Sequence, residues 1–361
     1  MKTSARFSRP QVAIVGPYPP PYGGIAVGIQ RLCCYLEAND VDFLVYNEAA
    51  RSSAAERLQG VGGPRRTLLR AFAAGPTRIL HYQSLDWRMR CLVALWGMLT
   101  GRKSVISIHA ECPEFSMQGP PLRNALIRFF LKRTSAVIAC NPDIVEQVAG
   151  LTGDRSRVHH VPAFMLPPPS AADAALPAEL EAFLAAHSPR LLWVGSSELM
   201  GGRDLYGLDQ TLTMLERLRE HFPGLGCVLW FSSNRAEAHW KALWQRCVER
   251  GLDRMLFVQN AGLPEIFPLF RRCDVFLRPT ITDGDSVSVR EALALGTPVV
   301  ASDVAPRPSM CVTFRVSDAN DFLSKVEAVL GDLETARAKA ASEPQEDNGG
   351  KILAIYRELG L

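Results

Sequence analysis

The chain has 361 residues, of which 47% are hydrophobic and 21% are charged, with a formal net charge of +3. This length suits two domains that each bury a core, and the composition is typical of a soluble globular protein. No uncharged apolar run approaches about 18 residues, and the basic N-terminal tail runs directly into an apolar strand, so neither a transmembrane helix nor a signal peptide is expected. The nine cysteines have no C-x-x-C spacing, which argues against a zinc site and favours reduced thiols in a cytosolic protein.

The first apolar run, Val-Ala-Ile-Val at residues 12–15, predicts a buried strand. The four prolines of the following GPYPPPYGG segment prevent a helix before Gly23 and Gly24, after which apolar residues recur at helical spacing. Glycines at such a turn allow a backbone to approach a ligand closely. They do not match the dinucleotide-binding pattern G-x-G-x-x-G, and an ordinary strand–helix turn explains them equally well.

Two further strands are predicted at residues 79–82 and 105–109, with an apolar helix at 90–100 between them. Each strand carries a histidine near its carboxyl end, His81 and His109, where the strands of a parallel sheet meet a ligand crevice. A histidine in this place is more often structural than functional. His81 is interpreted as structural or as a residue on the acceptor side.

Two basic amphipathic helices are predicted in the first half of the chain, at 67–73 and 122–133. For the first of them, a surface helix and a membrane-facing edge are equally good interpretations. Residues 1–165 contain 20 Lys and Arg against 11 Asp and Glu, a net charge of +9, whereas residues 166–361 contain 20 against 26, a net charge of −6. The first half would therefore be attracted to an anionic surface. No motif or aromatic interleaving supports nucleic-acid binding.

A proline- and alanine-rich segment at 162–179 lacks periodicity and predicts a linker between two domains. A strand at 190–194 opens the second domain, and leucines at helical spacing after residue 207 predict its first helix. The acidic stretch at 341–350 predicts a surface loop, and a last amphipathic helix follows at 351–361.

The strongest pattern lies at 274–303, DVFLRPTITDGDSVSVREALALGTPVVASD. An apolar strand, a loop, a helix at about 286–295 and a second apolar strand form a β-loop-α-β unit of a parallel sheet. Short capping residues at the start of the helix leave backbone N–H groups unpaired, and such an end binds anions, usually phosphate. Asp283 and Glu291 lie roughly 12 Å apart along this helix, which is too far for a shared proton or one metal ion but matches the span of a nucleotide sugar. A generic phosphate site with two incidental acids is the alternative.

Part of this stretch resembles the signature of the retaining glycosyltransferases of family 4, which have the GT-B fold. It consists of an acid, seven further residues, Glu291 and then Ala-Leu-Ala-x-Gly-x-Pro-Val-Val-Ala-Ser. The resemblance implies an α/β protein with two Rossmann-like, doubly wound domains that face each other across a cleft. It places an acceptor-side domain at 1–165, a linker at 166–187 and a nucleotide-sugar-binding domain at 188–348. A last helix at 349–361 would cross back to the first domain.

The resemblance also implies roles for individual residues. Asp283, one methylene shorter than the family's usual Glu, would bind sugar hydroxyls, Glu291 the ribose, and the amides at the helix start the phosphates. Asp285 stands where the family often has an aromatic residue, and His109 matches a strand-end histidine that lies near the donor sugar. The donor-binding residues implied are Gly23, Gly24, Asp285, Ser286, Val287, Ser288 and Glu291.

The clearest departure from the family lies in the loop after the first strand of the second domain. There the family usually carries an Arg and a Lys that neutralise the diphosphate, whereas this chain has Ser196 and Tyr206. Arg203 and Arg278 are the available replacements, because a diphosphate that leaves without a metal ion needs cationic help. The predicted catalytic set is His109, Asp283, Arg203 and Arg278.

The resemblance therefore predicts a retaining glycosyltransferase without a metal ion or other cofactor. It would move a sugar from a nucleotide-diphosphate sugar to a lipid-linked or polysaccharide acceptor in the synthesis of a bacterial cell-surface polysaccharide such as lipopolysaccharide. The place would be the cytoplasm or the cytoplasmic face of the inner membrane, whose anionic surface would bind the basic domain, and no nucleic-acid partner is expected. A non-catalytic nucleotide-sugar-binding subunit, which the missing basic pair supports, and a sugar-nucleotide epimerase or glycogen-type synthase of the same fold are the alternatives.

Overall fold

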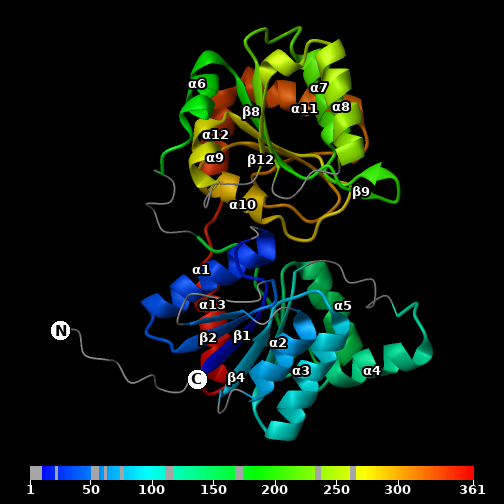
Figure 1. Cartoon of the computed structure of the whole chain (residues 1–361), viewed down its shortest axis with the longest axis vertical. Coiled ribbons are helices and arrows are strands. Elements are labelled where there is room, and N and C mark those ends of the chain that lie inside the picture. The colour runs from blue at the N-terminus through cyan, green and yellow to red at the C-terminus, as the bar shows by residue number, and fades with distance from the viewer. Residues whose placement is uncertain are drawn as a thin grey trace, which may run out of the picture. The chain divides into compact units, whose positions relative to one another are not determined.

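The computed structural model describes residues 10–20, 23–49, 57–60, 63–73, 77–109, 117–166, 174–231, 237–260 and 266–361. The chain divides into two compact units (Figure 1). Unit 1 comprises Met1–Met165 together with Asp347–Leu361, and unit 2 comprises Leu166–Glu346. None of the helices in the described part of the chain has the length and apolar character needed to cross a bilayer.

Unit 1 is built on a seven-stranded sheet with the order β3-β2-β1-β4-β5-β6-β7, in which all neighbouring strands are parallel. Its strands are β1 (Val12–Gly16), β2 (Phe43–Asn47), β3 (Leu58–Gly60), β4 (Ile79–Tyr82), β5 (Lys103–Ile108), β6 (Ala136–Ala139) and β7 (Val158–His160). Its helices are α1 (Gly24–Ala38), α2 (Pro64–Ala73), α3 (Trp87–Thr100), α4 (Pro121–Leu131), α5 (Pro142–Thr152) and α13 (Asn348–Glu358).

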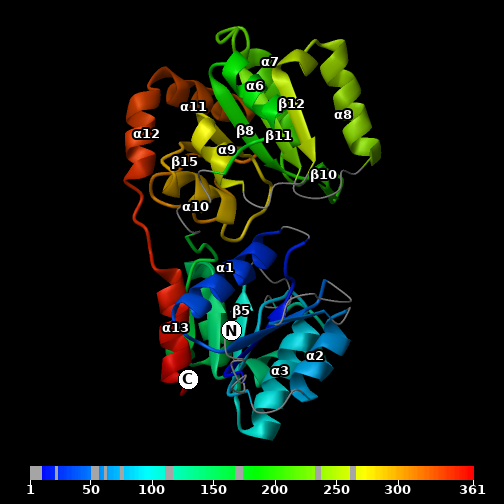
Figure 2. The same cartoon turned by 60° about the vertical axis from the view of Figure 1, so that its left-hand side comes forward.

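Helices cover both faces of this sheet, so its strands are apolar on both sides. Alternate residues of β1 show the two layers, because Ala13 and Val15 belong to the core under α3, α4 and α5, whereas Val12 and Ile14 belong to the core under α1 and α13. The last helix therefore lies in unit 1, where it contacts α1 and buries Tyr356 completely (Figure 2).

Unit 2 is built on a six-stranded parallel sheet with the order β12-β11-β8-β13-β14-β15 and carries a separate two-stranded antiparallel hairpin, β9–β10. Its strands are β8 (Arg190–Gly195), β9 (Leu199–Met200), β10 (Arg203–Asp204), β11 (Gly226–Phe231), β12 (Leu256–Asn260), β13 (Val275–Arg278), β14 (Val299–Ser302) and β15 (Val312–Phe314). Its helices are α6 (Ala178–Ala186), α7 (Leu208–Leu218), α8 (Glu237–Glu249), α9 (Phe267–Arg272), α10 (Val287–Ala294), α11 (Ala319–Gly331) and α12 (Leu333–Ala341).

The predicted linker at 166–187 is wrong in its second half. Residues 178–186 form α6, which begins directly after Pro177 and buries Leu180 and Leu184 in the core of unit 2. Two leucines four residues apart are a short helical signal, and the surrounding prolines and alanines hid it. Residues 167–173 of the predicted linker lie outside the described part.

Both sheets have the doubly wound strand order, which confirms the predicted α/β class. In each unit the first strand lies inside the sheet, and the order of strands reverses beside it, between β1 and β4 in unit 1 and between β8 and β13 in unit 2. In open parallel sheets, ligands bind outside the carboxyl ends of the strands at such a reversal. The loops after β8 and β13 are therefore the first place to look for a site in unit 2.

Candidate functional site

Two loops meet at the point of reversal in unit 2, one after β8 and one after β13. The amide of Ile281 donates a hydrogen bond to the carbonyl of Leu205 at 3.1 Å, which links the loops directly. Gly207 has a φ of +64°, and a Cβ there would come within 2.1 Å of the Pro279 carbonyl oxygen. Only glycine fits this close approach, so the loop geometry depends on this residue.

Asp283 lies in the second of these loops between two arginines. Arg278, the last residue of β13, donates from Nε to Oδ2 at 3.2 Å and from Nη2 to Oδ1 at 3.4 Å. Arg307, from the segment after β14, donates from Nη1 to Oδ2 at 2.9 Å. All three side chains are almost enclosed, with exposed fractions of 10% for Asp283, 13% for Arg278 and 3% for Arg307. The cluster carries two positive charges and one negative charge.

This charge balance sets the protonation of the cluster. Burial by itself would raise the pKa of Asp283, but the charges of Arg278 and Arg307 outweigh it and hold the pKa of the carboxyl group below its ordinary value. Burial would lower the pKa of Arg278, and Asp283 and Tyr206 more than compensate, so the guanidinium is held even more firmly in its charged form. The site therefore keeps a net positive charge at neutral pH.

Tyr206, at one of the two positions where the family usually has a base, supports Arg278 instead of carrying charge. The Arg278 guanidinium lies 5.0 Å from the centroid of the Tyr206 ring, within the range of a cation–π interaction. The indole Nε1 of Trp193 donates to the Tyr206 carbonyl at 3.0 Å and holds that residue in place. Ser196, at the other position, is buried and bears no charge.

Arg307 was missed by the sequence analysis. Its Nε donates to the Ser302 carbonyl at 3.0 Å and its Nη1 to Asp283, whereas its Nη2 is buried and has no hydrogen-bond partner in the described part of the chain. The sequence contained a signal for a site residue here, because Arg307 follows the carboxyl end of β14, the strand beside β13. The sequence alone does not show that the chain turns back toward Asp283 there.

Helix α10 begins beside the cluster. Ser286 is its N-cap residue, but the Ser286 hydroxyl lies 3.1 Å from the Ser288 hydroxyl and does not cap a backbone amide. That side chain therefore leaves the first-turn amides at Val287 and Ser288 uncapped, and their role as phosphate ligands stays a prediction.

The two other acids of the motif are buried. Asp285 forms an ion pair with Arg290, with 2.6 Å between Oδ1 and Nε, and its side chain is 2% exposed. Glu291 lies on α10 and is 4% exposed. Asp285 therefore has a partner within the first turn of the helix, and the predicted ligand roles of both acids stay predictions.

Within the described part of the chain, Arg203 forms no hydrogen bond or ion pair with Asp283. It lies on β10, and its Nη2 donates to the Ser317 hydroxyl at 2.7 Å. It also lines a cavity of about 500 Å³ with Arg246, His239 and Asp204, the last two of which are 3.3 Å apart. Of the two arginines proposed as replacements for the missing basic pair, the structure brings only Arg278 to Asp283.

In unit 1, His109 follows β5 at the carboxyl edge of the sheet. Its Nε2 atom is buried and has no hydrogen-bond partner among the described residues. Burial, with a smaller contribution from the charge of Arg90, lowers the pKa of His109 to about 4, so the imidazole is neutral at pH 7. Gly23 and Gly24 lie at the start of α1, where a Cβ on Gly23 would meet no atom within 4 Å. No steric requirement within the described residues explains glycine at that position.

His81 is structural within unit 1. It is fully buried, with Nδ1 2.5 Å from the Tyr356 hydroxyl and Nε2 2.7 Å from the Ser107 hydroxyl, so it ties β4 to β5 and to α13. Burial, and then the neighbouring His109, lower the pKa of His81 to about 3.

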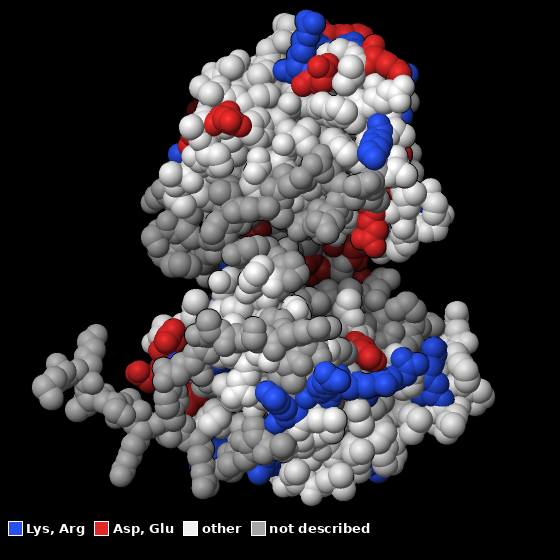
Figure 3. All heavy atoms as spheres, in the orientation of Figure 1, with Lys and Arg blue, Asp and Glu red and all other residues white. Residues whose placement is uncertain are grey.

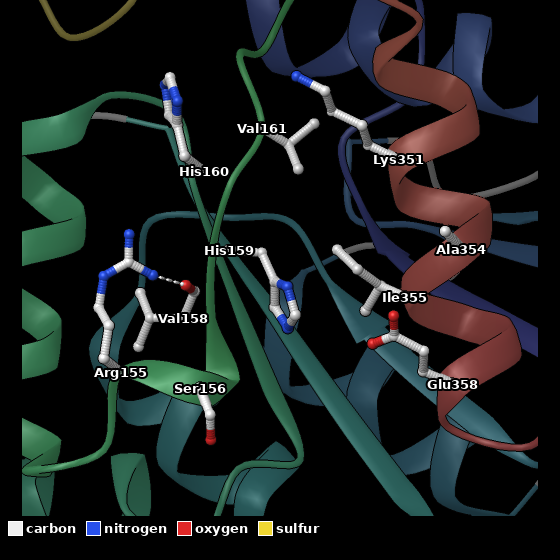
Figure 4. A pocket seen from close by; sticks show the side chains of 10 residues that line it. All are labelled: Arg155, Ser156, Val158, His159, His160, Val161, Lys351, Ala354, Ile355 and Glu358. Carbon is white, nitrogen blue, oxygen red and sulfur yellow. Dashed lines mark hydrogen bonds between the residues drawn. The ribbon is translucent and has the colours of Figure 1, made fainter.

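A second hollow, of about 560 Å³, lies between β7 and α13 in unit 1 (Figure 4). Arg155 and His159 line it from the β7 side, and Lys351 and Glu358 from α13. His159 points toward α13, and burial lowers its pKa although Glu358 acts in the opposite direction (Figure 4). No residue of the predicted site lines this hollow. In the described part of the chain, no group of three or more His, Cys, Asp or Glu residues is placed to hold a metal ion.

Two family models match the chain in consecutive segments. Residues 23–163 match the glycosyl transferase 4-like domain, and residues 188–332 match glycosyl transferases group 1. No curated protein sequence matches.

Similar solved structures cover nearly the whole chain. A glycosyltransferase from Rickettsia africae ESF-5 has a TM-score of 0.71 at 14% identity over 98% of this chain and 99% of that one. HepE of Anabaena, solved in complex with UDP, has a TM-score of 0.65 at 13% identity over 97% and 98%. Sucrose-phosphate synthase of Thermosynechococcus elongatus has a TM-score of 0.67 at 15% identity over 97% of both chains. At these identities the likeness shows the fold.

Two units that are each built on a doubly wound parallel sheet are the architecture of the GT-B fold, which the similar solved structures share. The two family models together span most of the chain. The chain belongs to the GT-B glycosyltransferases of the family 4-like type, and it is a glycosyltransferase.

Proposed function

We propose that the protein is a retaining glycosyltransferase whose donor is a nucleotide-diphosphate sugar bound by unit 2. The observation that carries the proposal is the cationic cluster of Arg278, Arg307 and Asp283 beside the open start of α10. A diphosphate would find there both guanidinium groups and unpaired backbone amides, which are the groups that bind phosphate in proteins. HepE, of the same fold, has been solved with UDP and with UDP-glucose, which supports a donor of this kind.

The reaction requires that the bond between the anomeric carbon and the diphosphate oxygen breaks and that a bond to an acceptor hydroxyl forms. The acceptor proton passes to the leaving phosphate, and no metal ion takes part. Arg278 would stabilise the negative charge that develops on the leaving diphosphate, because preorganised cations act most strongly where water is excluded. His109, neutral at pH 7, would offer a hydrogen bond to the sugar or the acceptor.

The acceptor is proposed to be lipid-linked, in the synthesis of a bacterial surface polysaccharide. Helices α2, α3 and α4 contain no Asp or Glu, and they pack side by side in unit 1. They expose Leu69, Leu99 and Leu122 by 65%, 78% and 73%. Lys and Arg side chains gather on the side of unit 1 that Figure 3 shows, where these helices lie in Figure 1. Apolar side chains among basic ones suit the surface of an anionic membrane.

The donor is tested with a thermal-shift panel of nucleotide sugars, followed by transfer and donor hydrolysis with the compound that binds best. A ligand at 100 times its dissociation constant should stabilise the protein by about 2.7 kcal/mol. Binding with turnover would support the transferase. Binding without turnover, even with candidate acceptors, would favour the non-catalytic subunit, and no binding by any compound would contradict a donor site in unit 2.

The membrane surface is tested separately by sedimentation with phosphatidylglycerol vesicles at low and high salt. Leu122→Ser and Arg128→Glu should each weaken binding, the second by roughly fivefold or more, because a base near an anionic surface contributes about 1 kcal/mol. Val248→Ser, at a residue of unit 2 that is 51% exposed, is the control and should have no effect. Binding that does not respond to salt would contradict the electrostatic part of the proposal.

A further inference from the structure

Unit 2 contains two carboxylates that are each bracketed by a pair of arginines, and they lie at opposite ends of one strand. Asp274 immediately precedes β13 and pairs with Arg190 and Arg337. Asp283 lies five residues beyond the end of that strand and pairs with Arg278 and Arg307. The Asp274 cluster is therefore at the amino edge of the parallel sheet, where ligands do not bind, and the Asp283 cluster is at the carboxyl edge, where they do.

The Asp274 cluster has the geometry of a structural ion pair. Two of its contacts are short, since the Arg190 amide and Arg337 Nη2 each donate at 2.7 Å, while Arg190 donates from Nε at 3.0 Å and from Nη2 at 3.2 Å. Arg337 Nη2 also donates to the Cys273 carbonyl at 3.2 Å. None of these three side chains has a buried polar atom without a partner in the described part of the chain.

The Asp283 cluster is looser, and one of its donors has no acceptor. Its contacts to Arg278 are 3.2 and 3.4 Å long, beyond the 2.7–2.9 Å that is usual for a charge-assisted hydrogen bond. Arg307 is more deeply buried than either arginine at Asp274, with 3% of its side chain exposed against 34% and 36%. Its Nη2 nevertheless has no partner among the described residues, although an unsatisfied buried donor is costly.

The carboxylate of Asp283 has no acceptor capacity to spare. Besides the two arginines it accepts contacts from the Gly284 amide at 3.2 Å and the Thr280 hydroxyl at 3.5 Å. A carboxylate offers about four lone-pair sites, and five donors surround this one. A sugar hydroxyl would have to displace one of these donors in order to bind it.

We propose that Arg307 is a donor-binding residue and that Asp283 is the positioning residue that holds Arg307 and Arg278 toward the diphosphate, in place of binding the sugar. An oxygen of the diphosphate would give Arg307 Nη2 the acceptor that the protein lacks. This inference rests on the proposed function, because it assumes a nucleotide-diphosphate donor in unit 2. It replaces the role that the resemblance implies for Asp283.

The test compares ligands that differ only by the sugar, namely UDP with UDP-glucose and GDP with GDP-mannose, by isothermal titration calorimetry on the full chain. Arg307→Met should weaken both members of the bound pair by roughly tenfold, the effect of losing one charge-assisted hydrogen bond. Asp283→Asn should also weaken both members equally, because it releases the two arginines. Arg307→Lys keeps the positive charge but loses the planar set of N–H donors of the guanidinium group. Its affinity should therefore lie between those of Arg307→Met and the wild type.

The cluster at Asp274 supplies matched controls. Arg337→Met and Asp274→Asn should lower the melting temperature and leave both affinities within twofold of the wild-type values. If Asp283→Asn does not fold, the affinities of Arg307→Met test the inference by themselves. That variant should fold, because it leaves Asp283 and Arg278 as a neutral pair.

Three outcomes would overturn the inference. Asp283→Asn that weakened only the nucleotide sugar would make Asp283 a sugar ligand, and Arg307→Met with wild-type affinity would exclude Arg307 from the site. Wild-type protein that bound neither member of either pair would contradict the proposed function as well, which distinguishes that failure from the other two.

Discussion

Titratable groups are buried at the carboxyl edges of both sheets, but their charge states differ between the two units. Unit 1 buries His81 and His109, and burial lowers the pKa of both, to about 3 and about 4, so that neither imidazole is charged at neutral pH. Unit 2 buries Asp283 with Arg278 and Arg307, and there the pKa of Asp283 is lowered and that of Arg278 is raised, so that both of these groups stay ionised. Neutral imidazoles suit an uncharged hydroxyl, and a cationic cluster suits a diphosphate. The strand order is the same in both units, so the chemistry comes from the loops and not from the fold.

The largest effect is expected from removing a cation at the charged edge. Arg278→Met should lower kcat by about 100- to 1000-fold, because a preorganised group that stabilises developing negative charge is worth about that much. The measurement is the steady-state rate with the donor found by the panel, with the melting temperature as a check of folding. The control is Arg190→Met at the Asp274 cluster, which should leave kcat unchanged. A rate for Arg278→Met within threefold of wild type would exclude this residue from the reaction.

A smaller effect on the rate is expected from replacing the neutral histidine of unit 1. His109→Gln should lower kcat by roughly tenfold, the loss of one hydrogen bond to the sugar or acceptor. Because the pKa of His109 is about 4, its protonation should not affect the rate of the wild-type enzyme between pH 6 and 8. A change of rate centred near pH 6.5 that disappears in His109→Gln would show that this histidine is an ordinary titrating group.

The free energy of unfolding should decrease at acid pH because unit 1 keeps its buried histidines neutral. The unfolded chain protonates histidine near pH 6.5, whereas folded His81 stays neutral down to about pH 3, so stability is complete above pH 6.5 and falls as the pH decreases below it. The slope should be up to about 1.4 kcal/mol per pH unit for His81. Urea denaturation at pH 7, 6 and 5 measures it, and His81→Gln should flatten the curve. An equal slope in that variant would assign the effect to other groups.

Local patterns in the sequence were sufficient for the elements around the site. The apolar runs at 275–277 and 299–301 predict β13 and β14, and the capping residues before α10 predict where that helix begins. These signals are short-range, because a strand, a cap and a helix are each specified by residues within a few positions of one another.

Elements without such a local signal were missed or misplaced. The β9–β10 hairpin has two residues in each strand, which is too short for any alternation to appear. The sequence predicts a linker where helix α6 forms, since prolines and alanines surround the two buried leucines of the helix. Arg307 is absent from the predicted site because its contact with Asp283 spans 24 residues and a turn of the chain after β14.

Hydrophobic periodicity and capping chemistry are local properties, so the sequence predicts the class of fold, the division into two units and the stretch of chain that forms the candidate site. The surroundings of Asp283, in contrast, come from contacts between distant parts of the chain. Which arginines reach a buried carboxylate depends on how separate strands lie side by side in the sheet, and the burial that lowers the pKa of His81 and His109 comes from elements distant in the chain.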